Sequence, residues 1–515
     1  MQKKESNLSI AIKIFGSGVI KNIATNLMAI LTRTVFIYYL NKDLLGINSA
    51  VNSIISILSL TELGVGTSFI YILYGALNRN NYDEINSIMR YFKKIYTIIG
   101  SLIFILGMIL IPFLDDLINT PNSVKKYVLP CYIIYVVQTC VSYLFSAYKR
   151  CLLLADKKEN IVNNIITIYS IATSCFQMLF IYVTHNYFAY LYCGLIAIIV
   201  QNIAISYIVD KKYQYLSIKQ ASSVNVNVKN KLRESITSIM VVKLGQAFYK
   251  ASDNLVISKF LGVSILAMYD NYNLILYALQ QVLSLLVTSF TAIIGHVAIN
   301  ESHEKLYDKY KKLQFITVFL FTLCSACYVN CIRPFIHWWI GSDYILSDKF
   351  AIIFALRFFV IGLNITLIVY KDAMGLFKYG RFLSPLTGVM NVILSIILVH
   401  KIGLTGIVLA SLICDVCIYY LVHPKTVIKI GMGMSLKEYY KDYFIYWMLM
   451  LLSIGTSKYI CDMISIKFDL IQFFMNGIIS FICVIVLYWI IKRNTEEWKY
   501  TNEFLGRLKT KKEGE

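Results

Sequence analysis

Long uninterrupted apolar runs constrain this 515-residue chain more than any other feature of its sequence. Runs such as Ile98–Phe113 and Phe473–Ile491 are long enough to cross the hydrocarbon core of a bilayer. Only 15% of the residues are charged, against about 25% in soluble globular proteins, so the charge is too sparse to cover several soluble domains. The chain is therefore predicted to be an integral membrane protein, which excludes a soluble enzyme. The runs do not alternate at every second residue, which excludes a membrane β-barrel.

Apolar runs between polar clusters predict an all-α fold of about fourteen transmembrane helices. We expect no cleaved signal peptide, because Lys21 and Arg33 interrupt the first apolar stretch. The expected helices are 14–40, 44–77, 95–114, 127–147, 161–184, 187–209, 236–260, 265–299, 313–332, 350–370, 382–400, 404–423, 443–461 and 470–491.

The distribution of Lys and Arg predicts the orientation in the membrane. With the N-terminus inside, the inner segments hold about 35 of the 49 Lys and Arg residues and the outer loops about 9. Both termini are then cytoplasmic, in a multi-pass protein of a cell membrane. The net charge of +20 consequently favours contact with anionic lipid headgroups, not nucleic acid. The largest outer loop, Arg333–Lys349, is short, and its Trp338-Trp339 pair is typical of an interfacial anchor.

The chain carries a weak internal repeat. An offset of 221 residues brings Val35 onto Val256 and Asn52 onto Asn273, and it equals six predicted helices. Parallel repeats of this kind occur in transporters that move two lobes about a central site. We expect an N-lobe of helices 1–6 at 1–209, a cytoplasmic linker at 210–235, a C-lobe of helices 7–12 at 236–423, helices 13–14 within 424–491, and a basic cytoplasmic tail at 492–515.

Charged residues inside the expected helices point to a wet interior. Each would cost about 2.5–3.5 kcal/mol at the centre of a bilayer if it faced lipid. The affected residues are Lys21, Arg33, Lys243, Lys250 and Arg357. They must line a cavity, pair with acids, or reach towards the interface.

Helical spacing favours a cavity, because polar residues recur every three or four positions along one face of four helices. Two of these helices belong to each half of the repeat. The predicted lumen is therefore lined by helices 1, 2, 7 and 8, and its net positive charge suits an anionic passenger such as a phosphate or diphosphate. The candidate substrate-binding residues are Lys21, Arg33, Asn52, Lys243, Gln246, Lys250, Asn273 and Gln281. The candidate ion-coupling residues are Asp253, Glu62 and Asp270.

Some of these residues have a purely structural alternative. Lys250 and Asp253 are three residues apart and can form an ion pair, which leaves open whether Asp253 binds a coupling ion. Arg357 and Asp415 lie mid-helix and can pair with each other. The CxxC spacings at Cys324 and Cys414 lie inside apolar helices and are interpreted as packing. We expect no metal site and no cofactor.

Several short motifs resemble those of the polysaccharide flippases of the multidrug/oligosaccharidyl-lipid/polysaccharide exporter superfamily. Helix 2 contains Leu44-Leu-Gly-Ile-Asn-Ser49 followed by Leu60-Thr-Glu-Leu-Gly-Val-Gly-Thr-Ser68. Helix 7 contains Ser252-Asp-Asn-Leu-Val-Ile-Ser-Lys-Phe-Leu-Gly262, with Asp253 at the family's Asp position. Helices 11 and 12 contain Asn391-Val-Ile-Leu-Ser395 and Ile402-Gly-Leu-Thr-Gly-Ile407. The sequence departs from the family pattern at Glu62, where a neutral residue or Asp is common.

The resemblance spans the whole chain and implies a V-shaped, MATE-like fold of two six-helix lobes plus two C-terminal helices. It implies a flippase for O-antigen or capsule repeat units, which moves an undecaprenyl-diphosphate-linked oligosaccharide from the inner to the outer leaflet of a bacterial cytoplasmic membrane. Expected partners are this lipid-linked oligosaccharide, a coupling H⁺ or Na⁺, and polysaccharide assembly proteins. The alternatives are a cation-coupled multidrug antiporter of the same fold and a membrane glycosyltransferase or polymerase. The short outer loops weigh against the last.

Overall fold

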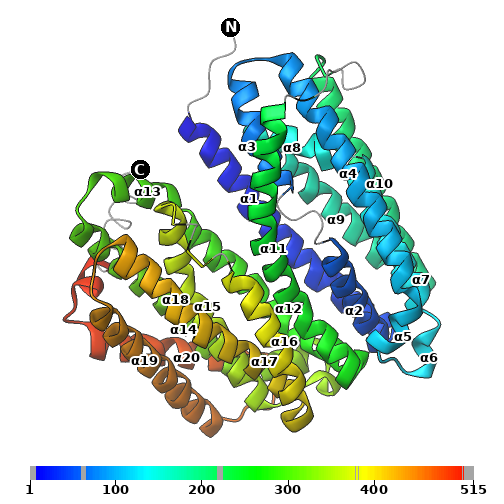
Figure 1. Ribbon diagram of the computed structural model, residues 1–515. Coiled ribbons are helices and arrows are strands. Elements are labelled where there is room, and N and C mark those ends of the chain that lie inside the picture. The colour runs from blue at the N-terminus through cyan, green and yellow to red at the C-terminus, as the bar shows by residue number, and fades with distance from the viewer. Residues whose placement is uncertain are drawn as a thin grey trace, which may run out of the picture. The chain divides into compact units, whose positions relative to one another are not determined.

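The computed structural model describes residues 7–59, 65–145, 147–216, 224, 226–376, 379–380, 382–501 and 503. Within these ranges every regular element is helical (Figure 1). The longer helices are α1 (Asn7–Tyr39), α2 (Lys42–Leu58), α3 (Val65–Asn78), α4 (Tyr82–Leu110), α7 (Val128–Phe145), α9 (Glu159–Thr184), α10 (Tyr187–Lys212), α11 (Val226–Leu261), α12 (Val263–Thr288), α14 (His303–Ile340), α15 (Asp348–Ala373), α16 (Leu383–Ile402), α17 (Leu404–Cys414), α19 (Leu436–Met463) and α20 (Asp469–Lys492). The shorter helices are α5 (Leu114–Leu117), α6 (Asn122–Lys125), α8 (Ala147–Ala155), α13 (Thr291–Asn300) and α18 (Tyr420–Pro424).

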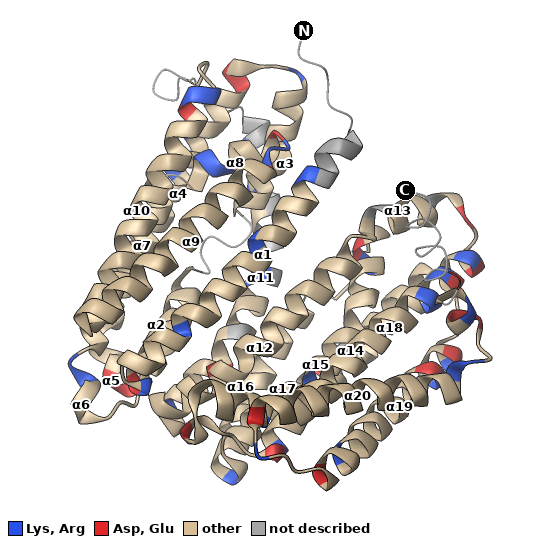
Figure 2. Ribbon diagram, turned by 180° about the vertical axis from the view of Figure 1, so that it is seen from behind, with Lys and Arg blue, Asp and Glu red and all other residues tan. Residues whose placement is uncertain are grey.

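Twelve stretches of the described chain are long and apolar enough to cross a membrane, so the chain is a multi-pass membrane protein. The expected number of about fourteen is not confirmed. The predicted helix 44–77 is two shorter helices, α2 and α3, and the predicted helix 236–260 lies within α11, which is not among the twelve. Most Lys, Arg, Asp and Glu residues lie towards the ends of the helices (Figure 2), as expected where helix centres contact lipid.

Several predicted boundaries differ from the structure, and two of them change the interpretation of a segment. The predicted helix 313–332 is the much longer α14, which runs on to Ile340. The expected outer loop from Arg333 is therefore helical for its first half, and Trp338 and Trp339 lie in the last turn of α14. The predicted helix 404–423 continues to Gly431 through two π-helical segments, Asp415–Tyr419 and Lys425–Gly431.

Residue contacts divide the chain into two units. Unit 1 comprises residues 1–267 and 384–392, and unit 2 comprises residues 268–383 and 393–515. The lobe boundaries expected from the internal repeat stay a prediction.

In unit 1, α1 packs along α9, and α10 packs against both α9 and α7. Glycines allow α4 and α7 to approach closely, because a Cβ at Gly107 would lie 3.2 Å from the Val136 methyl groups. Small residues at such contacts are typical of helix pairs in membranes, where close backbone approach maximises dispersion contacts. An aromatic cluster with Phe36, Tyr187 and Tyr190 joins the end of α1 to the start of α10.

Unit 1 also contains a close contact of α2 with the C-terminal end of α11 and the first turn of α12. Asn254 donates to Ser53 Oγ at 3.0 Å, and the hydroxyl of Ser264 donates to Asp43. Asp43 and Ser264 are separated by 221 residues, which is the offset of the sequence repeat. Contact between two repeat-related positions is expected where both lie beside a pseudo-twofold axis.

In unit 2, polar side chains bind the C-terminal helices to α14. Asn330 of α14 donates to Ser457 of α19 and Ser480 of α20, both at 2.9 Å, and its carbonyl accepts from Asn476 of α20 at 2.7 Å. Interhelical hydrogen bonds of this kind stabilise helix packing in lipid. Helices α19 and α20 are thus part of the same packed unit as α14.

Candidate functional site

Lys21 lies in the middle of α1 and contacts α9 through a neutral partner. Its Nζ donates to Asn163 Oδ1 at 3.2 Å, and Asn163 Nδ2 in turn donates to Ser17 Oγ at 3.2 Å. Among the described residues no carboxylate pairs with Lys21. Its positive charge is therefore held in place by α9 without being neutralised by it.

Arg33 lies three turns further along α1, half-buried beside a network of amides and phenols. It is close enough to Tyr190 of α10 to interact with it electrostatically. Asn48 of α2 donates to the Tyr190 hydroxyl at 3.3 Å and accepts from the Tyr135 hydroxyl of α7. Asn52, one turn beyond Asn48, has an exposed side chain that also reaches Tyr135. Four helices of unit 1 thus meet beside Arg33.

The polar residues predicted to form one stripe on α11 differ in their exposure. Lys243 and Gln246 have exposed side chains, while Asp253 is only 3% exposed. The side chain of Lys250 lies outside the described part of the chain, so its pairing with Asp253 stays a prediction.

The contacts beside Asp253 join two of the motifs that resemble the flippase family. Ser252 donates to Asn391 Oδ1 of α16 at 3.1 Å, and both residues are buried. Gly245 lets α11 and α16 approach, since a Cβ there would lie 2.2 Å from the backbone nitrogen of Pro385. The motif at Ser252 and the motif at Asn391 therefore belong to one packed region around Asp253.

The remaining candidates lie on α12 or outside the described residues. Asp270 is buried, and Asn273 and Gln281 are half-buried, all three in unit 2. Glu62 lies outside the described residues. A common lumen lined by α1, α2, α11 and α12 stays a prediction.

The expected partnership of Arg357 and Asp415 is present in unit 2. Arg357 Nε of α15 lies 3.4 Å from Asp415 Oδ2, and both side chains are largely buried. Asp415 is the first residue of a π-helical segment, and such segments widen a helix locally. The pair brings a positive and a negative charge together among packed helices.

The structure also contains an uncharged cavity that the sequence reasoning missed. It lies in unit 1 between α7, α9 and α10 and has a volume of about 380 Å³. Three glutamines and two tyrosines line it: Gln138, Gln177, Gln201, Tyr135 and Tyr190. Ser170, Ser174 and Gln177 lie on one face of an otherwise apolar helix, and this spacing could have predicted a polar site. From the sequence we considered charged residues within the helices and did not include these neutral ones.

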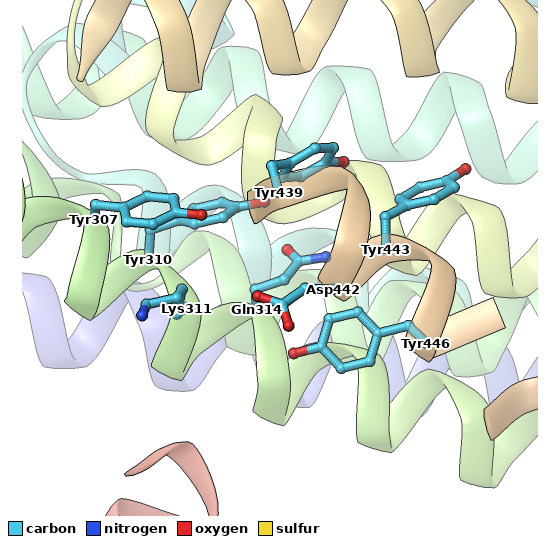
Figure 3. A pocket seen from close by; sticks show the side chains of 8 residues that line it. All are labelled: Tyr307, Tyr310, Lys311, Gln314, Tyr439, Asp442, Tyr443 and Tyr446. Atoms are coloured by element: carbon cyan, nitrogen blue, oxygen red, sulfur yellow. The ribbon is translucent and has the colours of Figure 1, made fainter. Parts of the chain in front are cut away.

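A second, much smaller cavity lies in unit 2 between α14 and α19 (Figure 3). Its volume of about 10 Å³ is room for roughly one water molecule. The Tyr310 hydroxyl and Gln314 Oε1 border it, and neither has a hydrogen-bond partner among the described residues. Lys492 of α20 reaches Asp442 of α19 at 3.5 Å. This cavity is a small polar gap between two packed helices and is too small for an organic substrate.

Comparison with known proteins identifies the fold. A family model described as "Polysaccharide biosynthesis protein" matches residues 13–293, more than half of the chain. No curated protein matches the chain. A solved structure of the lipid II flippase MurJ in an inward closed conformation is similar over 92% of this chain and 99% of that one, with a TM-score of 0.69 and 14% identity.

Two MATE transporters are also similar. An inward-facing MATE family transporter of the MOP superfamily has a TM-score of 0.64 and 11% identity, covering 81% of this chain and 98% of that one. The Vibrio cholerae MATE transporter VcmN in its bent form has a TM-score of 0.56 and 14% identity, covering 81% and 97%. These likenesses confirm the predicted MATE-like fold.

Proposed function

Because the chain belongs to the polysaccharide biosynthesis protein family, we propose that it carries a lipid-linked oligosaccharide across the membrane for the assembly of a surface polysaccharide. The passenger is a polyprenyl diphosphate, undecaprenyl diphosphate in a bacterial membrane, that bears a short glycan. The chain acts as a transporter and not as an enzyme, which agrees with its fold and with the shortness of its expected outer loops.

The observation that carries this proposal is the uncompensated charge of Lys21. A lysine in the middle of a membrane helix is costly unless it has a function or an acidic partner. Its partner in the described structure is the neutral amide of Asn163. An ammonium group held in this way is suited to bind a phosphate oxygen, since such charge-assisted hydrogen bonds are about twice as strong as neutral ones. Arg33 on the same helix adds a guanidinium, which can bind phosphate through two parallel hydrogen bonds.

Alternating access supplies the transport step. By the Lys and Arg distribution, the contact between α2 and α11 lies at the outer ends of these helices. The Asp43–Ser264 and Ser53–Asn254 hydrogen bonds close that end. They must break for a passenger to leave towards the outer leaflet, and they re-form once it has left.

Asp253 is the favoured coupling residue. A buried carboxylate is expensive unless a proton or a cation accompanies it. Asp253 lies beside the Ser252–Asn391 contact, which holds α11 against α16. Binding of H⁺ or Na⁺ at Asp253 would change the charge at this contact and so bias the position of α11. Glu62 and Asp270 are the other coupling candidates.

The runner-up function is a cation-coupled multidrug antiporter, because one of the similar structures is described as a multidrug resistance MATE family transporter and another as a MATE transporter. An exporter of organic cations needs an acidic binding site, whereas the charged residues on α1 are Lys13, Lys21 and Arg33, all of them basic. Cation export is therefore the weaker proposal.

The test compares surface polysaccharide in cells that lack the gene with cells that carry the wild type or Lys21→Ala. We expect the deletion and the variant to lose surface polysaccharide and to accumulate lipid-linked oligosaccharide facing the cytoplasm. Lys401→Ala, which removes an exposed lysine at the end of α16, is the matched control and should export normally. Normal surface polysaccharide in the deletion would refute the function. Normal export by Lys21→Ala at wild-type protein level would refute its role.

A further inference from the structure

The uncharged cavity of unit 1 has the size and lining of a binding site. We call it the glutamine pocket and define it by Tyr135 and Gln138 of α7, Gln177 of α9, and Tyr190, Gly194 and Gln201 of α10. Its volume of about 380 Å³ falls in the range of roughly 300–1,000 Å³ that is typical of small-molecule sites.

The polar lining is confined to one face of α9. Ser170, Thr173 and Gln177 line the pocket and are spaced by three and four residues. The other face carries lipid-exposed groups such as Ile168 and Phe176, which are 64% and 55% exposed. Apolar residues alone would be enough for this membrane helix to pack. Its polar stripe lowers stability unless the polar groups find hydrogen-bond partners.

Two of the glutamines have unused hydrogen-bonding capacity. Gln138 is only 8% exposed, and its amide makes no hydrogen bond to any described residue. Gln177 uses one Nε2 hydrogen, donated to the Tyr190 carbonyl at 3.3 Å, and its Oε1 accepts from no described residue. An amide offers two donors and an acceptor with two lone pairs. The pocket therefore presents several donors and acceptors to whatever occupies it.

Gly194 allows these amides to lie where they do. A Cβ at this position would be 3.3 Å from the Nε2 atoms of both Gln138 and Gln177. Any side chain at position 194 would therefore displace both amides or fill the space in front of them.

The chemistry of the lining selects a neutral, hydroxyl-rich ligand. No charged side chain of the described residues lines the pocket, so it lacks the Lys or Arg that a diphosphate requires and the carboxylate that an organic cation requires. Amides and hydroxyls both donate and accept, as the hydroxyl groups of a sugar ring do. Tyrosine adds an apolar ring face beside a polar tip, which suits the mixed surface of a pyranose.

The pocket adjoins the cationic residues of α1. Tyr190 both lines it and interacts with Arg33. Tyr135 lines it too and donates to Asn48. A ligand with its diphosphate at Arg33 can therefore extend its glycan towards the pocket.

We propose that the glutamine pocket binds one neutral sugar residue of the transported lipid-linked oligosaccharide. This inference rests on the proposed function, and it separates two tasks. Lys21 and Arg33 bind the diphosphate, which every such lipid shares. The three glutamines of the pocket form hydrogen bonds to the sugar and so select it.

The test measures binding of two lipids to purified full-length protein in detergent. The probes are undecaprenyl diphosphate and the undecaprenyl-diphosphate-linked oligosaccharide extracted from the host cells, each titrated and followed by native mass spectrometry. Wild type should bind the sugar-bearing lipid more tightly. The double variant Gln138→Met/Gln177→Met should lose about tenfold or more of that affinity, since each amide supplies at least one hydrogen bond, and should bind undecaprenyl diphosphate as wild type does.

Two further variants separate binding from folding. Gly194→Ala keeps every glutamine and should weaken binding of the sugar-bearing lipid alone. Gln214→Met makes the same chemical change on an exposed side chain beyond the end of α10 and should alter neither affinity.

The outcomes distinguish the two proposals. A wild-type preference for the sugar-bearing lipid that persists in both the double variant and Gly194→Ala would overturn the pocket's role and leave the proposed function standing. Binding of neither lipid by wild-type protein would overturn both. Equal loss of both lipids in well-folded variants, judged by an unchanged melting temperature, would overturn sugar selectivity.

Discussion

Replacing Gly46 by alanine should open the contact of α2 with the end of α11 and the start of α12. A Cβ at Gly46 would lie 1.9 Å from the backbone oxygen of Val263. Ordinary van der Waals contact begins near 3.4 Å, so the two backbones must separate by about 1.5 Å. Neither backbone can move aside as a flexible side chain would. The Gly46→Ala chain therefore cannot adopt the contact that is present here.

The energetic cost follows from the hydrogen bonds that such a separation breaks. Two side-chain bonds, Asp43–Ser264 and Ser53–Asn254, are worth roughly 0.6 kcal/mol each in a membrane protein. Asn119, between α5 and α6, also accepts from the Val263 amide, and this backbone bond, worth about 1 kcal/mol, is lost when Val263 is displaced. The total is about 2 kcal/mol, which shifts the ratio of closed to open contact by about thirtyfold.

Hydrogen exchange read by mass spectrometry measures this shift directly. The Val263 amide is protected by its bond to Asn119, so its exchange should accelerate by about thirtyfold in Gly46→Ala. Gly455→Ala is the matched control, because a Cβ at Gly455 meets no atom within 4 Å. Surface polysaccharide should fall in Gly46→Ala at a normal level of inserted protein. Unchanged protection of the Val263 amide would refute the steric reasoning.

Four other predictions concern charge and topology. Arg357→Leu should destabilise the protein by about 3–5 kcal/mol, because it strands a buried carboxylate, and Arg357→Leu/Asp415→Leu should recover most of the melting temperature; a double variant no more stable than the single would contradict the pairing. Lys21→Arg should restore part of the export that Lys21→Ala loses, since the charge returns with a different geometry. If Asp253 is only the counter-ion of Lys250, Lys250→Ala/Asp253→Ala should recover the surface polysaccharide that either single variant loses. If Asp253 binds the coupling ion, as we favour, the double variant should insert normally and not transport. Topology reporters fused after Lys312 or Lys441 should report the cytoplasm and one within Ser342–Ser347 the exterior; a cytoplasmic signal at the last site would contradict the orientation.

Local physics in the sequence was enough to predict the class of protein. Runs of apolar residues determine that segments are helical and cross lipid, because no other single-segment structure satisfies the backbone there. The same locality limits how well the sequence predicts helix boundaries. Apolarity continues from residue 44 to residue 77, whereas the structure has α2 end at Leu58 and α3 begin at Val65, so a continuous pattern concealed two separate helices.

The sequence motifs indicated the family, but they did not show why these residue types occur at their positions. Gly46 stands out in the sequence only as part of a motif, and the structure explains it through the carbonyl of Val263, more than two hundred residues away. Ser252 and Asn391 likewise belong to separate motifs that meet only in the packed unit. Contacts between distant segments depend on which helix faces align, and the helical period of one segment does not contain that information.

Charged residues and neutral polar residues also differ in how easily they are recognised from the sequence. A lysine within an apolar run, such as Lys21, is conspicuous because its cost in lipid is large wherever the helix lies. Gln138, Gln177 and Gln201 cost less singly and are unremarkable along the chain. Only the packing of α7, α9 and α10 brings their amides around one cavity, with Gly194 leaving room for two of them. The sequence by itself thus determined a helical membrane protein with cationic helices, and the tertiary structure decided where a neutral ligand fits, because a cavity is a property of several helices and of none alone.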